Sequence, residues 1–247
     1  MTAARRLRRL LPYLKRSLVL HQGRLRHRVY IAASPYKTGT TSLGRALIEL
    51  GAGTRDMGHA PRLIRLHQPL ITRLNRMVDP EIGARDFLAR HGDEVRREMR
   101  RMTAALARFD VFSDAPFGHT MIHPFLRKAV APKARFIWLN RDFDAWIDSV
   151  RNWELSHPGT YPDHRLWIEA PERQIQLRRR LWQRSLRDFQ RLEEAFPEDC
   201  LRVSLTSLTD YRTLARFCGL PPPEGPFPRL NTRDDRGRAP SGSETGG

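Results

Sequence analysis

The strongest structural signal in this 247-residue sequence lies in Val29-Tyr30-Ile31-Ala32-Ala33-Ser34-Pro35-Tyr36-Lys37-Thr38-Gly39-Thr40-Thr41-Ser42-Leu43. An apolar run breaks at a short loop and resumes with helix-forming residues. Pro35 and Gly39 bracket a tight turn, and Lys37 places an ammonium group above it. Residues 40–42 add hydroxyls and free backbone N–H groups at a helix start, where the helix dipole favours an anion. The segment therefore predicts a strand, a phosphate-binding loop and a helix.

The order of residues in this loop differs from that of the common nucleotide-triphosphate loop, G-x-x-x-x-G-K-[ST], in which the lysine follows the second glycine. In Lys37-Thr38-Gly39-Thr40-Thr41-Ser42-Leu43 the lysine comes first. This order closely resembles the 5′-phosphosulfate-binding loop of sulfotransferases that use 3′-phosphoadenosine 5′-phosphosulfate (PAPS). The alternative interpretation is an ordinary strand, turn and helix of an α/β scaffold.

A second strand-to-helix junction lies at residues 134–150. Residues 134–140 form an apolar run typical of a buried strand, and residues 141–150 carry apolar side chains at helical spacing. Arg141 then follows the strand, and Ser149 lies about two turns along the helix. Taken alone, they indicate a surface ion pair and a solvated hydroxyl. Together, and after the first loop, they resemble the 3′-phosphate-binding motif of sulfotransferases.

The two junctions predict an α/β fold, and the resemblance to bacterial-type sulfotransferases implies its form. We expect a P-loop-like, three-layer sandwich with a central parallel sheet flanked by helices, plus a helical insertion at residues 61–109. The chain would comprise a basic amphipathic helix at 1–28, the sulfotransferase domain at 29–231 and a disordered tail at 232–247. The expected buried face of the insertion contains Leu63, Leu66, Leu70 and Leu74.

Asp114 ends a third short apolar run. In open parallel sheets, ligands bind beyond the carboxyl ends of the strands, so Asp114 is the first candidate for a general base. In better-known sulfotransferases the corresponding sequence is Thr-His-x-Pro, and its histidine is the base; here Ser113-Asp114-Ala115-Pro116 stands in a similar place. His119 is the second candidate and His123 the third, and either could instead cap or pack the following helix. His59 could face the substrate cleft or be structural.

The net charge of +17 comes mostly from arginine, because lysine occurs only at Lys15, Lys37, Lys128 and Lys133. Such a charge suits nucleic acid, yet the sequence contains neither zinc-ligand spacing nor an RNA-stacking motif, so we expect no nucleic-acid partner and no metal site. Two cysteines without a metal pattern indicate a reducing compartment, and no apolar stretch is long enough to cross a bilayer. We expect a cytoplasmic protein. Its N-terminal helix could contact an anionic membrane or pack on the domain.

The resemblance implies an enzyme that moves the sulfuryl group of PAPS to a hydroxyl or amine of a small-molecule, lipid or carbohydrate acceptor. The implied catalytic residues are Lys37, Asp114 and His119. The implied PAPS-binding residues are Lys37, Thr38, Gly39, Thr40, Thr41, Ser42, Arg141 and Ser149. Two alternatives are a kinase with a variant phosphate loop, for which Asp114 could serve as the metal partner, and a non-catalytic nucleotide-binding adaptor.

Overall fold

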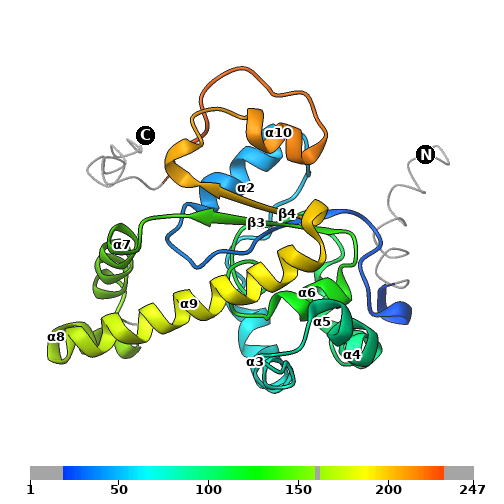
Figure 1. Ribbon diagram of the computed structural model, residues 1–247, viewed down its shortest axis with the longest axis horizontal. Coiled ribbons are helices and arrows are strands. Elements are labelled where there is room, and N and C mark those ends of the chain that lie inside the picture. Colours follow the sequence, from blue (N-terminus) through cyan, green and yellow to red (C-terminus); the bar gives the residue numbers. More distant parts are fainter. Residues whose placement is uncertain (1–18, 159–161, 231–247) are drawn as a thin grey trace, which may run out of the picture.

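A computed structural model describes residues 19–158 and 162–230 (Figure 1). The tail prediction for residues 232–247, and the greater part of the predicted N-terminal helix, lie outside this range. Within it, residues 19–22 are helical, and this helix ends at Gly23, whose φ of 64° is left-handed. None of the described helices is both long and apolar enough to cross a membrane.

The central sheet has four parallel strands in the order β2-β1-β3-β4. The strands are β1 (Val29–Ala32), β2 (Val111–Phe112), β3 (Ala134–Asn140) and β4 (Cys200–Ser204). Every residue of β1 is buried, as expected for an inner strand covered on both faces. Because the strands are parallel, the segments that follow β1, β2 and β3 emerge at the same edge of the sheet.

Helices cover both faces of the sheet, and the predicted three-layer α/β fold is confirmed (Figure 1). On one face, α2 (Thr40–Glu49) and α10 (Arg212–Cys218) pack against Tyr30 and Ala32. The opposite face contacts the other helices through Val29 and Ile31, since neighbouring side chains of a strand point to opposite faces. These helices are α3 (Pro61–Arg76), α4 (Ala84–Glu98), α5 (Arg100–Leu106), α6 (Pro124–Val130), α7 (Phe143–Ser156), α8 (Leu166–Glu169) and α9 (Pro171–Ala195). Short 3₁₀ turns lie at Pro162–Arg165, Pro197–Asp199 and Leu205–Ser207.

The predicted helical insertion is present as α3, α4 and α5, between α2 and β2. The prediction that Leu66 belongs to its buried face is wrong, because 72% of that residue is exposed. The buried residues of α3 are His67, Ile71 and Leu74, which repeat at helical spacing and turn Leu66 toward solvent. On this turn of α3 the buried residue is therefore His67, where the sequence analysis expected Leu66.

Candidate active site

The loop between β1 and α2 has the geometry of an anion-binding loop. Its backbone is left-handed at Lys37, with φ of 65°, and at Gly39, with φ of 93°. A Cβ on Gly39 would lie 2.8 Å from Cδ1 of Leu205, so the Leu205 side chain would have to move to admit any other residue. The first intrahelical hydrogen bond runs from the Leu43 N–H to the Gly39 carbonyl (3.0 Å). The three N–H groups of residues 40–42 precede that bond, and such N–H groups at a helix start bind anions.

Hydroxyl groups of the loop are largely engaged within the protein. The Thr38 hydroxyl donates to the Pro35 carbonyl (2.7 Å) and thereby closes the turn. Ser42 Oγ accepts a hydrogen bond from the Leu230 N–H (2.9 Å), and Thr40 Oγ1 lies 2.9 Å from His119 Nε2. The remaining threonine, Thr41, is exposed. The loop therefore offers an anion mainly backbone N–H groups, with the hydroxyls shaping the backbone.

Arg141, from the predicted 3′-phosphate motif, contacts the lysine-bearing loop. Arg141 follows β3, and its Nη1 donates to the carbonyl of Lys37 (2.7 Å). Trp146, on α7, donates from Nε1 to the neighbouring carbonyl of Tyr36 (2.8 Å). Ser149 is half-buried on the same helix. The adjacency of β1 and β3 thus brings together two motifs that are far apart in the sequence.

The Lys37 ammonium lies 4.0 Å from the centre of the Trp153 ring, a cation–π contact. Trp153 in turn stacks on His157, with ring centres 3.8 Å apart. Both aromatic residues belong to the C-terminal end of α7 and its cap. One helix therefore contacts the loop at the Tyr36 carbonyl and at the Lys37 side chain.

A buried carboxylate that the sequence analysis missed also holds the loop. Glu154, on α7, is fully buried and accepts hydrogen bonds from the Tyr36 hydroxyl and from Trp167 Nε1 (2.6 Å). Arg178 of α9 forms an ion pair with it (2.6 Å). Glu154 follows the buried Val150 by four positions and so lies on the apolar face of α7. This spacing is the feature of the sequence from which its burial could have been predicted.

Asp114 lies just beyond β2, where two histidines approach one of its oxygens. Asp114 Oδ1 is 3.4 Å from His119 Nδ1 and 3.5 Å from His59 Nδ1. The side chain of Asp114 is 33% exposed, that of His59 53% and that of His119 10%. Asp56 places the segment with His59 beside β2, because its carboxylate accepts from the N–H and hydroxyl of Ser113. Burial raises the pKa of Asp56.

His119 is fixed from several sides. The main-chain N–H of His119 donates to the Ala32 carbonyl (2.7 Å), and the main-chain carbonyl of His119 accepts from Arg127 Nη1 (2.8 Å). Burial lowers the pKa of His119 to about 4, although the nearby Asp114 carboxylate opposes this effect. Burial also lowers the pKa of Arg127 to about 9. The imidazole of His119 is therefore neutral at neutral pH.

Lys37 and His119 share an unusual backbone conformation. Across residues 19–158 and 162–230, they are the two non-glycine residues with positive φ, at 65° and 57°. Such conformations cost energy and persist where the surrounding structure enforces them, often at functional sites. The coincidence supports the selection of both residues as candidates.

His123, the third candidate for the general base, caps the helix that follows it, which is the structural role that the sequence analysis gave as the alternative. Its Nδ1 accepts from the Phe125 N–H at the start of α6 (3.2 Å), and its Nε2 lies 3.4 Å from Asp188. Burial lowers the pKa of His123. Both ring nitrogens thus serve the packing of α6 against α9.

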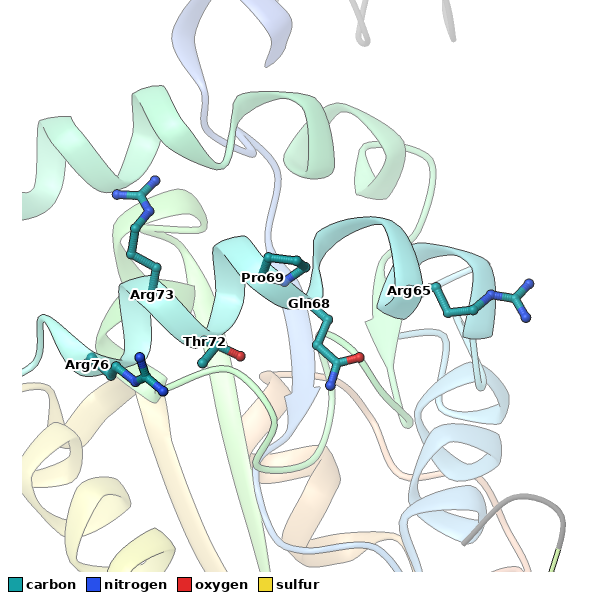
Figure 2. Close-up of a pocket in the computed structure, with 6 residues that line it drawn as sticks. All are labelled: Arg65, Gln68, Pro69, Thr72, Arg73 and Arg76. Carbon is teal, nitrogen blue, oxygen red and sulfur yellow. The ribbon is translucent and has the colours of Figure 1, made fainter. Parts of the chain in front are cut away.

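A hollow of about 570 Å³ lies along α3, outside the site described above, and Figure 2 shows the side chains that line it. The described residues that line it are Arg65, Gln68, Pro69, Thr72, Arg73 and Arg76. All are exposed and lie on the solvent side of the helix, opposite the buried Ile71, and Arg73 pairs with Glu98 (2.8 Å). This surface is a basic helix face rather than an enclosed pocket.

Comparison with protein families agrees with this geometry. A family model described as a sulfotransferase domain matches residues 30–196. This range contains the loop, Asp114, His119, Arg141 and Glu154. No curated protein matches the sequence. Because the matched range covers more than half of the sequence, the chain belongs to the sulfotransferase family.

Proposed function

We propose that this protein transfers the sulfuryl group of PAPS to a hydroxyl or amine acceptor. The observation that carries the proposal is the 2.7 Å hydrogen bond from Arg141 to the Lys37 carbonyl. It joins two anion-binding segments on neighbouring strands, and PAPS has two anionic ends, a 5′-phosphosulfate and a 3′-phosphate. We call Lys37–Ser42, Arg141 and Ser149 the donor site.

The residues of the donor site fit these two groups. The N–H groups of residues 40–42 and the Lys37 ammonium suit the phosphosulfate, while Arg141 and the Ser149 hydroxyl suit the 3′-phosphate. Bound PAPS supplies the sulfuryl group and leaves as 3′-phosphoadenosine 5′-phosphate (PAP). Lys37 and the backbone N–H groups stabilise the negative charge that grows on the departing phosphate.

The acceptor proton goes to Asp114, the more exposed of the two candidate bases. We place the acceptor on the open side of Asp114, next to His59, and expect a small molecule, a lipid or a carbohydrate. The insertion borders this side, because the Ala60 N–H at the start of α3 donates to the carbonyl of Ala115 (3.0 Å). Residues of α3 would therefore influence the choice of acceptor.

Calorimetric titration of PAP, ADP and ATP, each with and without magnesium, tests the proposal. We expect PAP to bind at least about tenfold more tightly than ADP, independently of magnesium. Magnesium-dependent preference for ATP would instead support a kinase. Tight PAP binding without sulfation of any acceptor in a broad screen would support a nucleotide-binding adaptor.

A further inference from the structure

Thr40, His119 and Asp114 form a continuous polar chain from the start of α2 to the exposed edge of the site. His119 Nε2 lies 2.9 Å from Thr40 Oγ1, and His119 Nδ1 lies 3.4 Å from Asp114 Oδ1. Thr40 is 5% exposed and His119 8%. Both nitrogens of the buried ring are thus occupied by protein groups, which leaves neither one for an acceptor molecule.

In the free protein the direction of the Thr40–His119 hydrogen bond follows from the charge state of the ring. His119 is neutral because burial lowers its pKa to about 4. A neutral ring that faces a carboxylate through Nδ1 keeps its proton there, because a bare nitrogen would otherwise face a negative oxygen. Nε2 is then an acceptor, and the Thr40 hydroxyl donates to it. That hydroxyl proton is consequently withheld from an anion at the start of α2.

Protonation of the ring reverses the Thr40 contact. An imidazolium carries a proton on both nitrogens, so Nε2 becomes the donor and Thr40 Oγ1 the acceptor. The Thr40 hydroxyl is then able to donate to an anion held by the N–H groups beside it. A bound anion would also stabilise the imidazolium by charge attraction.

The charged and titratable groups around His119 act in both directions on its pKa. Asp114 and the backbone of Ser113 raise its pKa, whereas Arg127 of α6 and His59 lower it, and the ring centre of Tyr36 is 6.3 Å away. Burial has the largest effect and favours the neutral ring. One additional negative charge at the start of α2 acts in the opposite direction.

We propose that His119 is a positioning residue that takes up a proton when the anionic donor binds, and thereby turns the Thr40 hydroxyl toward that anion. This inference rests on the proposed function. It assigns His119 to the donor site, and leaves Asp114 to receive the acceptor proton.

Proton-linked calorimetry with PAP tests the inference without an acceptor. PAP would be titrated into the full-length protein at about pH 6, in two buffers of different ionisation enthalpy, and the bound protons obtained from the difference in heat. We expect the wild-type protein to take up as much as about one more proton per nucleotide than the His119→Gln and Thr40→Val variants. Thr40→Ser keeps the hydroxyl and should restore the uptake. Because every variant binds the same nucleotide, the ionisation of PAP itself cancels.

The matched control is His91→Gln, which removes a half-exposed histidine beside Glu94 on α4. This variant should take up as many protons as the wild type. Uptake that persists in Thr40→Val would overturn the inference, since His119 would then respond to the anion without the hydroxyl. Equal uptake by wild type and His119→Gln would overturn it as well. Failure of the wild-type protein to bind PAP would remove the proposed function, and the inference with it.

Discussion

Arg141 donates from Nη1 to the main-chain carbonyl of Lys37 at 2.7 Å, so the side chain that follows β3 holds the loop that follows β1. A guanidinium has five N–H donors in a fixed plane, and this contact uses one of them. Guanidinium groups also bind phosphate in a bidentate manner. We infer that Arg141 supports the loop and contacts the nucleotide as well.

Arg141→Lys keeps the charge but lacks the planar set of donors. We expect this variant to bind PAP about 10- to 100-fold more weakly than the wild type, with a smaller loss for ADP, which has no 3′-phosphate. Calorimetry with both nucleotides measures the difference. Equal losses for PAP and ADP would show that Arg141 only supports the loop.

Lys37→Met removes the ammonium and keeps an unbranched side chain. We expect sulfuryl transfer to slow by about 100-fold or more, while PAP affinity changes by less than about tenfold, because the contact strengthens as the phosphate departs. Transfer to water, followed as release of PAP and sulfate from PAPS with protein in excess, gives the rate, and calorimetry gives the affinity. A rate close to that of the wild type would exclude a catalytic role for Lys37.

Glu154→Ala leaves the partly buried Arg178 without its carboxylate partner, and we expect a loss of about 3 kcal/mol in the free energy of unfolding. Tyr36→Phe removes one donor to the same carboxylate and should cost about 1–2 kcal/mol. Urea unfolding measures both. If Glu154 positions the loop, Tyr36→Phe should also weaken PAP binding; unchanged binding would limit the buried carboxylate to a role in stability.

Gly44→Ala tests the packing of α2 against the segment that carries the candidate base. The new Cβ would lie 2.4 Å from Asp56 Oδ2 and 2.7 Å from Ser113 Cβ. We expect a loss of about 1–3 kcal/mol from this overpacking. The control is Gly58→Ala, whose Cβ would meet no other atom of the described residues within 4 Å. Similar melting temperatures for the two variants would contradict the predicted clash.

The pKa of His119 in the folded protein, about 4, is lower than that of an unfolded histidine, about 6.5. Between these values the unfolded chain binds more protons, so stability should fall as the pH drops from about 6.5 toward 4. Burial lowers the pKa of His123 as well, and it contributes in the same direction. Urea unfolding at about pH 7 and pH 5 should show a decrease on the order of 2 kcal/mol that is reduced in His119→Gln. An identical pH dependence in His119→Gln would contradict the conclusion that the lowered pKa of His119 causes the loss of stability.

The sequence was sufficient to predict the parts of the site that depend on local pattern. The loop after β1 and the placement of Arg141 follow from apolar runs that end in polar residues, and this pattern is visible without the fold. The parallel sheet follows from the same alternation of strand and helix. For His123 the helix-capping alternative also had a local cause, because the residue directly precedes Pro124 at the start of α6.

Contacts between distant side chains could not be predicted in this way. The Thr40–His119 hydrogen bond joins the start of α2 to the segment after β2, and the Tyr36–Glu154 contact joins the loop to the C-terminal end of α7. Leu66 was misplaced for a related reason: its spacing fits a helix, but the side that is buried depends on where the sheet lies. Each of these required the three-dimensional arrangement.

The place of β1 between β2 and β3 has a consequence for how the protein is made. Its partners begin at Val111 and Ala134, so both pairings close long stretches of chain, which slows folding. A chain emerging from the ribosome exposes the lysine loop long before it contains Arg141. A fragment that ends before Ala134 would carry the loop sequence and β2 but neither β3 nor Arg141, and the proposed nucleotide binding should therefore arise late in the maturation of the polypeptide.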